Sequence, residues 1–392
     1  MRFVALRLEV LALRLQETSL GVLAETRRAM TQKVTLKLFS ICEKRHLYGC
    51  FFLLKIFHMI LILSSKFDHS TNSVCDWLNH MGEDVVRLNK DDCRYSFEYI
   101  NAEGVYFYDN IMKVHINLLD ARSCWWRRTG LSLQHFSRTN SNILEKDSID
   151  ISYFTTPNNP TLQREFRRLR EYIYHRIFDR CSINLGIPVF DFNRLTVLEQ
   201  AKQCGLIIPE YSIVTNSAQL NFFKQKWGKI VTKAISNGLY DDINGYRYYT
   251  YTELLEDDVI TSNDKVDFFP SLLTKMVDKK FEIRSFYIEG VFFSMAIFSQ
   301  SSEQTKIDFR KYDNNRTEPF RLPKEIENKM KRLFSILNLN CGSIDFIVDK
   351  SDDYIFLEIN PVGQYGMTDF PCNYNLDYKI ANYLRNGKVT QY

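Results

Sequence analysis

The pattern of apolar and polar positions changes at Met59, where short apolar runs begin to alternate with stretches of helical periodicity. The run 60–63 ends in two serines and predicts a buried first strand, followed by a helix near residues 71–80. Similar runs at 84–88 and 105–108 predict two further strands. This alternation is typical of an α/β domain.

Two more units follow along the chain. A charged stretch at 161–180 predicts a helix that leads into a second unit. There we expect a helix at 196–204 and strands at 211–214 and 229–235. The third unit is expected to be mostly strands, with one helix at 324–337 and strands at 272–277, 282–288, 291–298, 343–348 and 354–359.

These elements predict the fold class α/β (α+β) with three domains. An N-terminal α/β domain with its linker helix is expected at 59–182, and a central small domain at 183–269. A C-terminal antiparallel-sheet domain is expected at 270–392.

Residues 1–58 differ in composition from the rest of the chain. They contain no Asp and no Pro, whereas all nine prolines lie from Pro157 onward. The apolar run 50–63 is interrupted by Lys55 and is shorter than the roughly 20 residues that a membrane span needs. We expect residues 1–58 to be a non-native or dispensable extension, with natural translation starting at Met59. A genuine amphipathic helix or membrane anchor is the alternative.

Charge and cysteine content argue against nucleic-acid binding and against a metal site made of Cys and His. Residues 1–58 hold ten Lys/Arg against four Glu, a net +6, which leaves the rest of the chain at −2. A slightly acidic body lacks the basic face that nucleic-acid binding needs. The nine cysteines form no CxxC pair and no metal-spaced cluster with His. We expect them to be buried thiols in a reducing cytoplasm.

The sharpest chemical signal is a hairpin of two apolar strands around a polar turn. If that turn centres between Ser351 and Asp352, antiparallel pairing places Asp345 opposite Glu358. Asn360 shares the face of Glu358 because strand side chains alternate with period two. Two carboxylates and an amide oxygen predict a Mg²⁺ site, since like charges repel unless a cation lies between them. A half-solvated hairpin with scattered acids is the alternative.

Three further features could serve phosphates. An apolar strand ends in Lys233, before a polar, glycine-containing stretch, so its ammonium could reach phosphate oxygens. Glu282 and Arg284 are two residues apart, as are Asp308 and Arg310, so each pair shares a strand face. Arginine suits triphosphate oxygens, and acids suit ribose hydroxyls or a proton in transit. A surface lysine and surface salt bridges are the alternatives.

The order of these motifs, from the lysine strand through the acid–arginine pairs to the terminal hairpin, resembles that of the ATP-grasp superfamily over residues 190–368. Several motifs look more closely like the grasp-with-spasm peptide maturases, the graspetide or microviridin-ligase-like branch, which form side-chain ester or amide cross-links in ribosomal peptides. The resemblance covers nearly all of residues 59–392. It is carried by the segments 125–128, 283–287, 294–300, 308–310 and 357–364.

The resemblance implies that the chain uses ATP and Mg²⁺, with magnesium held by the two acids and the amide of the hairpin. Lys233 would contact phosphate, and Met276 and Val277 would offer backbone groups to adenine. Thr274 and Lys275 occupy a hinge where the superfamily usually has glutamine and glutamate. Adenine recognition would therefore rest on backbone groups at this hinge.

Other roles are implied in the same way. Glu282 would lie near the ribose, Arg284 and Arg310 would face phosphates, and Asp308 is the candidate base for the nucleophile's proton. Arg194 stands where the family usually has a lysine. Because arginine keeps the charge but not the geometry, its role in nucleotide binding stays open.

The implied reaction is ATP-dependent ligation. An Asp or Glu side chain of a ribosomal precursor peptide would become an acylphosphate, which a Ser, Thr or Lys side chain of the same peptide would attack. The implied partners are that peptide's leader and core, a radical-SAM protein with a SPASM domain and a second copy of the chain, in the cytoplasm and without nucleic acid or membrane. The alternatives are a ligase that adds free amino acids to a peptide or protein terminus and a non-catalytic nucleotide-binding module that recognises a peptide.

A docking surface for the leader is expected at residues 239–262. The segment holds four closely spaced tyrosines beside Glu253, Glu256, Asp257 and Asp258. An exposed strand with tyrosines could take an extended or helical leader, and the acids would select basic residues in it. A solvated hairpin is the alternative, and the next candidate surface is the Arg-Arg pair at 127–128.

Overall fold

The computed structural model describes most of the chain from Met59 onward. These residues belong to the second of two units, Met1–Phe57 and His58–Tyr392. The expectation for residues 1–58 therefore lies outside the described residues. Of residues 240–243, 246–249 and 301 only the backbone is described. The described ranges are 59–136, 159–236, 240–243, 246–249, 252–255, 266–301 and 315–389.

The N-terminal unit is built on a four-stranded parallel sheet of order β2-β1-β6-β7. Between β2 and β6 along the chain, β3, β4 and β5 form a separate three-stranded antiparallel sheet of order β3-β4-β5. The strand β7 pairs with β6 although it lies beyond the predicted boundary at residue 182. The elements are β1 (Met59–Ser64), α4 (His69–His80), β2 (Val85–Asn89), β3 (Tyr95–Ile100), β4 (Val105–Asp109), β5 (Val114–Asn117), η1 (Leu118–Asp120), β6 (Ala121–Trp126), η2 (Leu133–His135), α6 (Pro160–Arg180) and β7 (Ile183–Leu185).

Local sequence explains where these elements begin. The apolar run of β1 is fully buried, as its lack of polar alternation predicts. Asp68 caps α4 by accepting a hydrogen bond from the Thr71 N–H. Asn159 caps α6, and Pro160 stands at the first position of that helix, where its missing N–H costs nothing.

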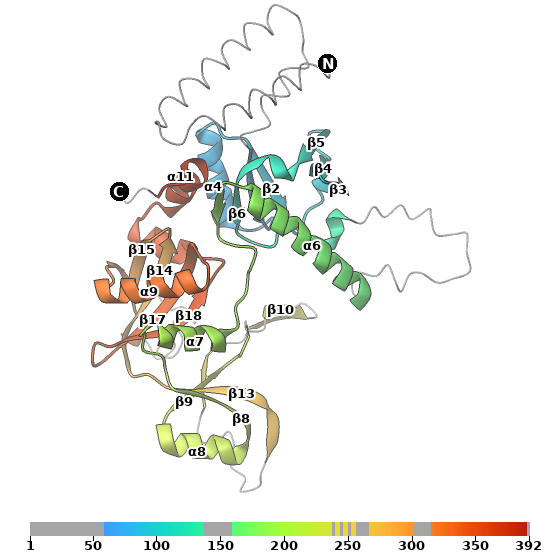
Figure 1. Ribbon diagram of the computed structural model, residues 1–392. Helices are drawn as coiled ribbons and strands as arrows, with labels where there is room; N and C mark the ends of the chain where they lie inside the picture. Colours follow the sequence, from blue (N-terminus) through green and yellow to red (C-terminus); the bar gives the residue numbers. More distant parts are fainter. Residues whose placement is uncertain are drawn as a thin grey trace, which may run out of the picture. The chain divides into compact units, whose positions relative to one another are not determined.

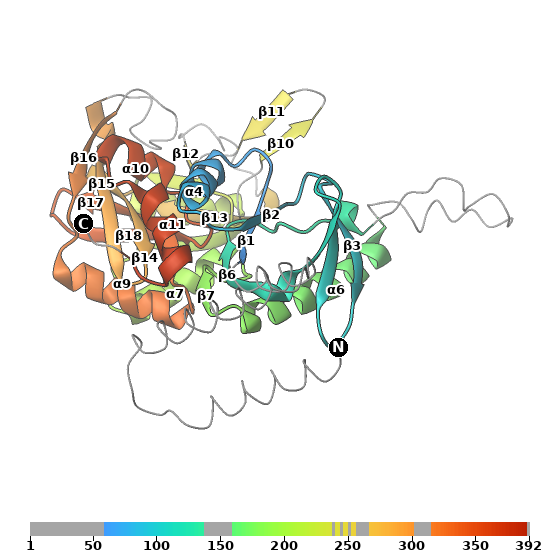
Figure 2. The ribbon, with the colours of Figure 1, turned by 90° about the horizontal axis from the view of Figure 1, so that it is seen from above.

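The central unit has an antiparallel sheet of order β12-β9-β13-β8, and α8 packs against β8 and β9 (Figure 1). The hairpin β10–β11 forms a separate two-stranded sheet (Figure 2). Because β13 pairs with β8 and β9, this strand of the central sheet crosses the predicted boundary between residues 269 and 270. The elements are α7 (Arg194–Gln203), β8 (Tyr211–Asn216), α8 (Ser217–Trp227), β9 (Ile230–Lys233), β10 (Tyr240–Ile243), β11 (Tyr246–Tyr249), β12 (Glu253–Leu254) and β13 (Asp267–Lys275).

The C-terminal unit confirms the predicted antiparallel sheet, with order β16-β15-β14-β17-β18. One face of this sheet packs on α9 and α7 through a shared apolar core (Figure 1). The last helix, α11, packs against α4 of the N-terminal unit (Figure 2). The elements are β14 (Lys279–Ile288), β15 (Val291–Phe298), η3 (Ser299–Ser301), β16 (Arg316–Phe320), α9 (Lys324–Ile336), β17 (Cys341–Asp349), β18 (Tyr354–Asn360), α10 (Gly366–Cys372) and α11 (Leu376–Asn386).

The seven cysteines within the described residues are free thiols. The expectation that the cysteines are buried is wrong for Cys93, which is exposed, because it lies in the polar turn between β2 and β3. Cys75 is half-buried, and Cys42 and Cys50 lie outside the described residues. Among the described helices, none has both the length and the apolar character that crossing a membrane requires.

Candidate active site

Three neighbouring strands place an arginine and two acids in one row. Arg284 on β14 lies directly opposite Asp345 on β17, which lies directly opposite Glu358 on β18. Directly opposed residues of antiparallel strands share a face of the sheet. Ser343 pairs with Asn360 two positions along, so Asn360 lies on the same face as Glu358. The predicted pairing of the two acids is confirmed.

The turn of this hairpin differs from the prediction. Near the turn, Val348 pairs with Tyr354 and Phe346 with Phe356, so the turn centres on Ser351. Leu357 is then an extra residue that shifts the register before Glu358. The predicted register is therefore correct at the two acids because a β-bulge offsets the misplaced turn centre.

Cations surround both carboxylates of the row. The Arg284 Nη1 donates to Oδ1 and Oδ2 of Asp345 at 2.7 and 2.6 Å. The Arg194 Nη2 donates to Glu358 Oε2 at 3.0 Å, and its Nη1 donates to the Ala234 carbonyl. Lys233 Nζ lies 3.9 Å from the same Glu358 oxygen. The like charges of the two acids are thus balanced by three basic side chains from β14, α7 and β9.

The donor set of this row suits a magnesium ion. Asn360 accepts a hydrogen bond from the Val362 N–H at 3.0 Å, which fixes its amide and leaves an oxygen lone pair available. Among the described residues no group of three His, Cys, Asp or Glu side chains could hold a metal. A magnesium ion bound here would therefore use Asp345, Glu358, the Asn360 oxygen and ligands from outside the protein, which is its usual preference.

Glu282 shares the face of Arg284 but is buried. It accepts hydrogen bonds at Oε1 from Lys279 Nζ at 2.5 Å and from Ser299 Oγ at 2.8 Å. Burial raises the pKa of the Glu282 carboxyl, and Lys279 and Ser299 offset only part of that rise. Its contact with a ribose stays a prediction.

The hinge residues lie apart from the row of charges. Lys275 is half exposed, and its Nζ pairs with Glu210 Oε1 at 2.9 Å. The Met276 N–H already donates to the Lys229 carbonyl at 2.9 Å. Within the described part of the chain, the Val277 N–H has no hydrogen-bond acceptor. Of the hinge N–H groups, that of Val277 is the one left to meet a ligand.

The predicted residues Asp308 and Arg310 lie outside the described residues. Their proposed roles as base and phosphate ligand therefore stay predictions.

A cavity of about 820 Å³ opens beside the row. Its wall combines loops after β1, β2 and β6 with the start of α7, the segment after β9 and the end of β18. Of the predicted site residues it includes Arg194, Glu358 and Asn360. The lining residues are Ser65, Phe67, Asp68, Lys90, Arg128, Phe190, Asp191, Phe192, Arg194, Val197, Ile235, Ser236, Glu358, Ile359, Asn360, Pro361, Val362 and Gln364.

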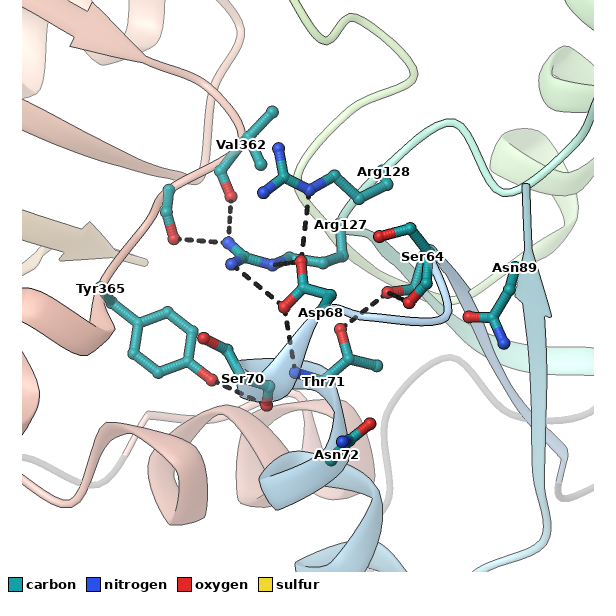
Figure 3. Close-up of polar contacts among 12 residues, drawn as sticks. Ser64, Asp68, Ser70, Thr71, Asn72, Asn89, Arg127, Arg128, Val362 and Tyr365 are labelled. Carbon is teal, nitrogen blue, oxygen red and sulfur yellow. Dashed lines mark hydrogen bonds and ion pairs between the residues drawn. The ribbon is translucent and has the colours of Figure 1, made fainter. Parts of the chain in front are cut away.

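Arg127 ties the N-terminal unit to the loop that follows Asn360 (Figure 3). Its side chain is 3% exposed and contacts Asp68 through Nε at 3.0 Å. Its Nη1 donates to the carbonyls of Val362 at 2.9 Å and Gly363 at 2.7 Å. Gly363 has φ +66°, and a Cβ there would lie 2.9 Å from the Phe286 ring, so glycine is required.

Asp68 is the shared partner of two guanidinium groups. Burial by itself would raise the pKa of the Asp68 carboxyl, but Arg127 and Arg128 hold it below its usual value. Sequence reasoning noted the Arg-Arg pair as a motif and as the second candidate surface for the leader, and it did not find Asp68 or Lys90. A signal was present, because cations directly follow β2 at 90 and β6 at 127–128, where the carboxyl ends of parallel strands meet.

The chain was compared with known protein families, curated sequences and solved structures. No family model matches the chain, and no curated protein matches it in sequence. A Chryseobacterium gregarium RiPP-associated ATP-grasp ligase, solved with ADP and a leader and core peptide, matches with TM-score 0.63 and 20% identity over 84% of this chain and 97% of its own. The macrocyclase MdnC from Microcystis aeruginosa, solved with the precursor peptide MdnA, matches with TM-score 0.62 and 22% identity over 84% and 99%.

A third solved structure agrees with these two. The ATP-grasp ligase PsnB, solved with a minimal precursor, Mg and ADP, matches with TM-score 0.58 and 13% identity over 83% of this chain and 96% of its own. All three likenesses extend over almost the full length of the other protein. We conclude that the chain has the fold of the ATP-grasp ligases.

Proposed function

We propose that the chain is an ATP-dependent ligase that activates Asp or Glu side chains of a ribosomal precursor peptide and joins them to Ser, Thr or Lys side chains. The observation that supports this most is the row Arg284–Asp345–Glu358, with Asn360 on its face and Arg194 and Lys233 beside it. The fold adds support, because the solved neighbours include ligases with ADP and with leader, core or precursor peptides bound.

The row divides into groups for metal and for phosphate. Asp345, Glu358 and Asn360 would hold Mg²⁺, which, when bound, would neutralise charge on the phosphate oxygens. Lys233 on β9 and Arg194 on α7 lie outside the C-terminal sheet that carries the row. We propose that their side chains turn from Glu358 to phosphate oxygens as ATP enters. Positive charge placed on the phosphate oxygens in this way lowers the barrier of phosphoryl transfer through positioning and electrostatics.

The reaction balances in two steps. A side-chain carboxylate oxygen of the peptide attacks the γ-phosphorus of ATP, the bond to the β–γ bridging oxygen breaks, and ADP leaves. A hydroxyl oxygen or amine nitrogen of the same peptide then attacks the acyl carbon, the bond to the phosphate oxygen breaks, and phosphate leaves. The nucleophile's proton goes to a base, for which Asp308 is our candidate. Holding both side chains of one peptide in one cavity removes much of the entropic barrier.

The test uses the full chain with ATP, Mg²⁺ and a small peptide encoded beside its gene. The peptide should lose one water for each bond formed, with one phosphate released for each water lost. A peptide that instead gains an amino acid residue would identify a ligase that adds free amino acids. An unchanged peptide mass, with ADP still bound by the protein, would identify a non-catalytic module.

The leader is proposed to dock on residues 239–262. The hairpin β10–β11 supports this, because it pairs only with itself within the described residues and so offers strand edges. The acids Glu256, Asp257 and Asp258 lie outside the described residues. Replacing these three with Ser should weaken binding of the leader and leave ADP binding unchanged. Equal leader affinity in that variant would exclude this surface.

Three further parts of the proposal come from the resemblance. A radical-SAM protein with a SPASM domain and a second copy of the chain are proposed partners, and the cytoplasm is the proposed location. The free thiols of the described residues are compatible with a reducing compartment. Light scattering of the purified chain, alone and with the SPASM protein, measures both associations. A monomer mass in each case would exclude them.

A further inference from the structure

The N-terminal wall of the cavity lies at the carboxyl ends of three adjacent parallel strands. β2, β1 and β6 lie in this order and end at Asn89, Ser64 and Trp126, so the residues that follow them meet at one edge (Figure 3). In open α/β sheets, ligands bind in the crevice outside this edge. Lys90 follows β2 directly, and Arg128 follows β6 after one residue; both line the cavity.

Both cations keep donors that no acceptor of the described residues meets. Arg128 donates through Nε to Asp68 Oδ2 at 3.2 Å (Figure 3), but its two terminal nitrogens have no acceptor among the described residues. Lys90 is exposed, and its ammonium has no acceptor in the same part of the chain. By contrast, Arg127 is fully engaged with Asp68 and two carbonyls.

The acids of the cavity wall do not neutralise this charge. Glu358 is paired with Arg194, and Asp68 is shared by two arginines. Asp191 remains, and it is exposed. Burial and the neighbouring Arg127 lower the pKa of the Arg128 guanidinium, so an anion bound beside it would be stabilised. Aromatic side chains of Phe67, Phe190 and Phe192 line the same wall and suit the apolar parts of a peptide.

We propose that Arg128 and Lys90 form a carboxylate subsite that holds an acidic side chain of the substrate peptide, in the cavity that Glu358 also lines. This inference rests on the proposed function, and it adds a specificity determinant contributed by the N-terminal unit. Arginine and lysine with open donors favour a carboxylate, and the guanidinium fork fits its two oxygens. The phosphates of ATP would be held by Lys233 and by Arg194, which lines the same cavity.

The test measures binding of two small probes to the full chain by NMR titration: N-acetylglutamate N-methylamide and its uncharged glutamine counterpart. The wild type should bind the glutamate probe about tenfold more tightly, which corresponds to one charge-assisted hydrogen-bonded contact. Arg128→Gln and Lys90→Gln should each remove most of this preference. Lys113→Gln, an exposed lysine outside the cavity wall, should leave it unchanged.

Three results would overturn the inference. The first is equal binding of the two probes by the wild type, and the second is an unchanged preference in the Arg128→Gln/Lys90→Gln double variant. The third is that inorganic phosphate binds more tightly than the glutamate probe and displaces it, which would make the crevice a phosphate site. Binding of Mg·ADP, measured in the same samples, separates this test from the proposed function. If the wild type does not bind ADP, the proposed ligase function is refuted. Unchanged ADP binding in the variants shows that they are folded.

Discussion

The row Arg284–Asp345–Glu358 and the crevice of the N-terminal unit differ in how far their charged groups are already paired. In the row, each acid already has an arginine partner, at 2.6 Å for Asp345 and 3.0 Å for Glu358. In the crevice, Arg127 is satisfied and buried, while Arg128 and Lys90 keep open donors. A ligand must exchange partners to enter the row, whereas an anion can enter the crevice without breaking an ion pair. The proposed magnesium and phosphates would therefore enter the row by exchange of these ion-pair partners, whereas the proposed carboxylate would meet donors that are already open.

The largest expected effect is on turnover, from changes within the row. Asp345→Asn and Glu358→Gln each remove an anionic ligand and keep the side-chain shape, so ATP consumption with peptide and Mg²⁺ should fall by more than about 100-fold. Thermal unfolding should show nearly intact folding. Glu325→Gln, an exposed acid on α9, is the matched control and should be silent. Ordinary magnesium-dependent ATP consumption in either row variant would exclude the metal assignment.

The next effect separates the two neighbouring arginines of the crevice. Arg127→Gln leaves Asp68 and two carbonyls without their buried partner, so it should lower the free energy of unfolding by about 3 to 5 kcal/mol. Arg128→Gln removes one partly exposed pair and should cost about 1 kcal/mol or less. Urea unfolding followed by tryptophan fluorescence compares them. Equal losses in the two variants would show that Arg127 does not join the units as described.

Much of the row could be predicted from sequence, because it depends on local rules. Period two and a short turn place Asp345, Glu358 and Asn360 on one face, and the error in the turn centre was offset by the bulge at Leu357. The cations beside these acids follow from no local rule. Arg194 reaches Glu358 only because α7 packs near β18, a contact between segments far apart in sequence.

The crevice could not be predicted for a similar reason. Lys90 and Arg128 line one cavity only because β2 and β6 flank β1, and strand order is not encoded in the pattern of any one strand. The role of Lys275 at the nucleotide stays a prediction. Its side chain pairs with Glu210 at the surface, a contact between segments far apart in sequence that no local pattern shows.

A smaller effect concerns the pH dependence of the crevice. The folded-state pKa of Asp68 lies below its ordinary value of 3.8, so the stability it contributes is fully present above that value and is lost as the pH falls through the lowered pKa. The melting temperature of Asp68→Asn should lie well below the wild type near neutral pH, and the difference should shrink below about pH 4. Asp76→Asn, an exposed acid on α4, should show no such trend. A difference that stays constant with pH would contradict the ion pair.

The smallest effect is expected for residues 1–58, which differ in composition from both regions. A shortened chain that begins at Met59 should stay soluble and bind ADP with the affinity of the full chain, because the row and the crevice both lie after Met59. Gel filtration and calorimetry provide the measurement. Insolubility of the shortened chain, with the full chain soluble, would contradict the view that the extension is dispensable.

The claim that the row holds magnesium beside a nucleotide is tested most directly by calorimetric titration of ADP into the full chain, with and without Mg²⁺. The wild type should bind ADP at least about tenfold more tightly with Mg²⁺, and Glu358→Gln should lose that dependence while Arg128→Gln keeps it. Equal ADP affinity of the wild type with and without Mg²⁺, or an unchanged magnesium dependence in Glu358→Gln, would contradict the claim.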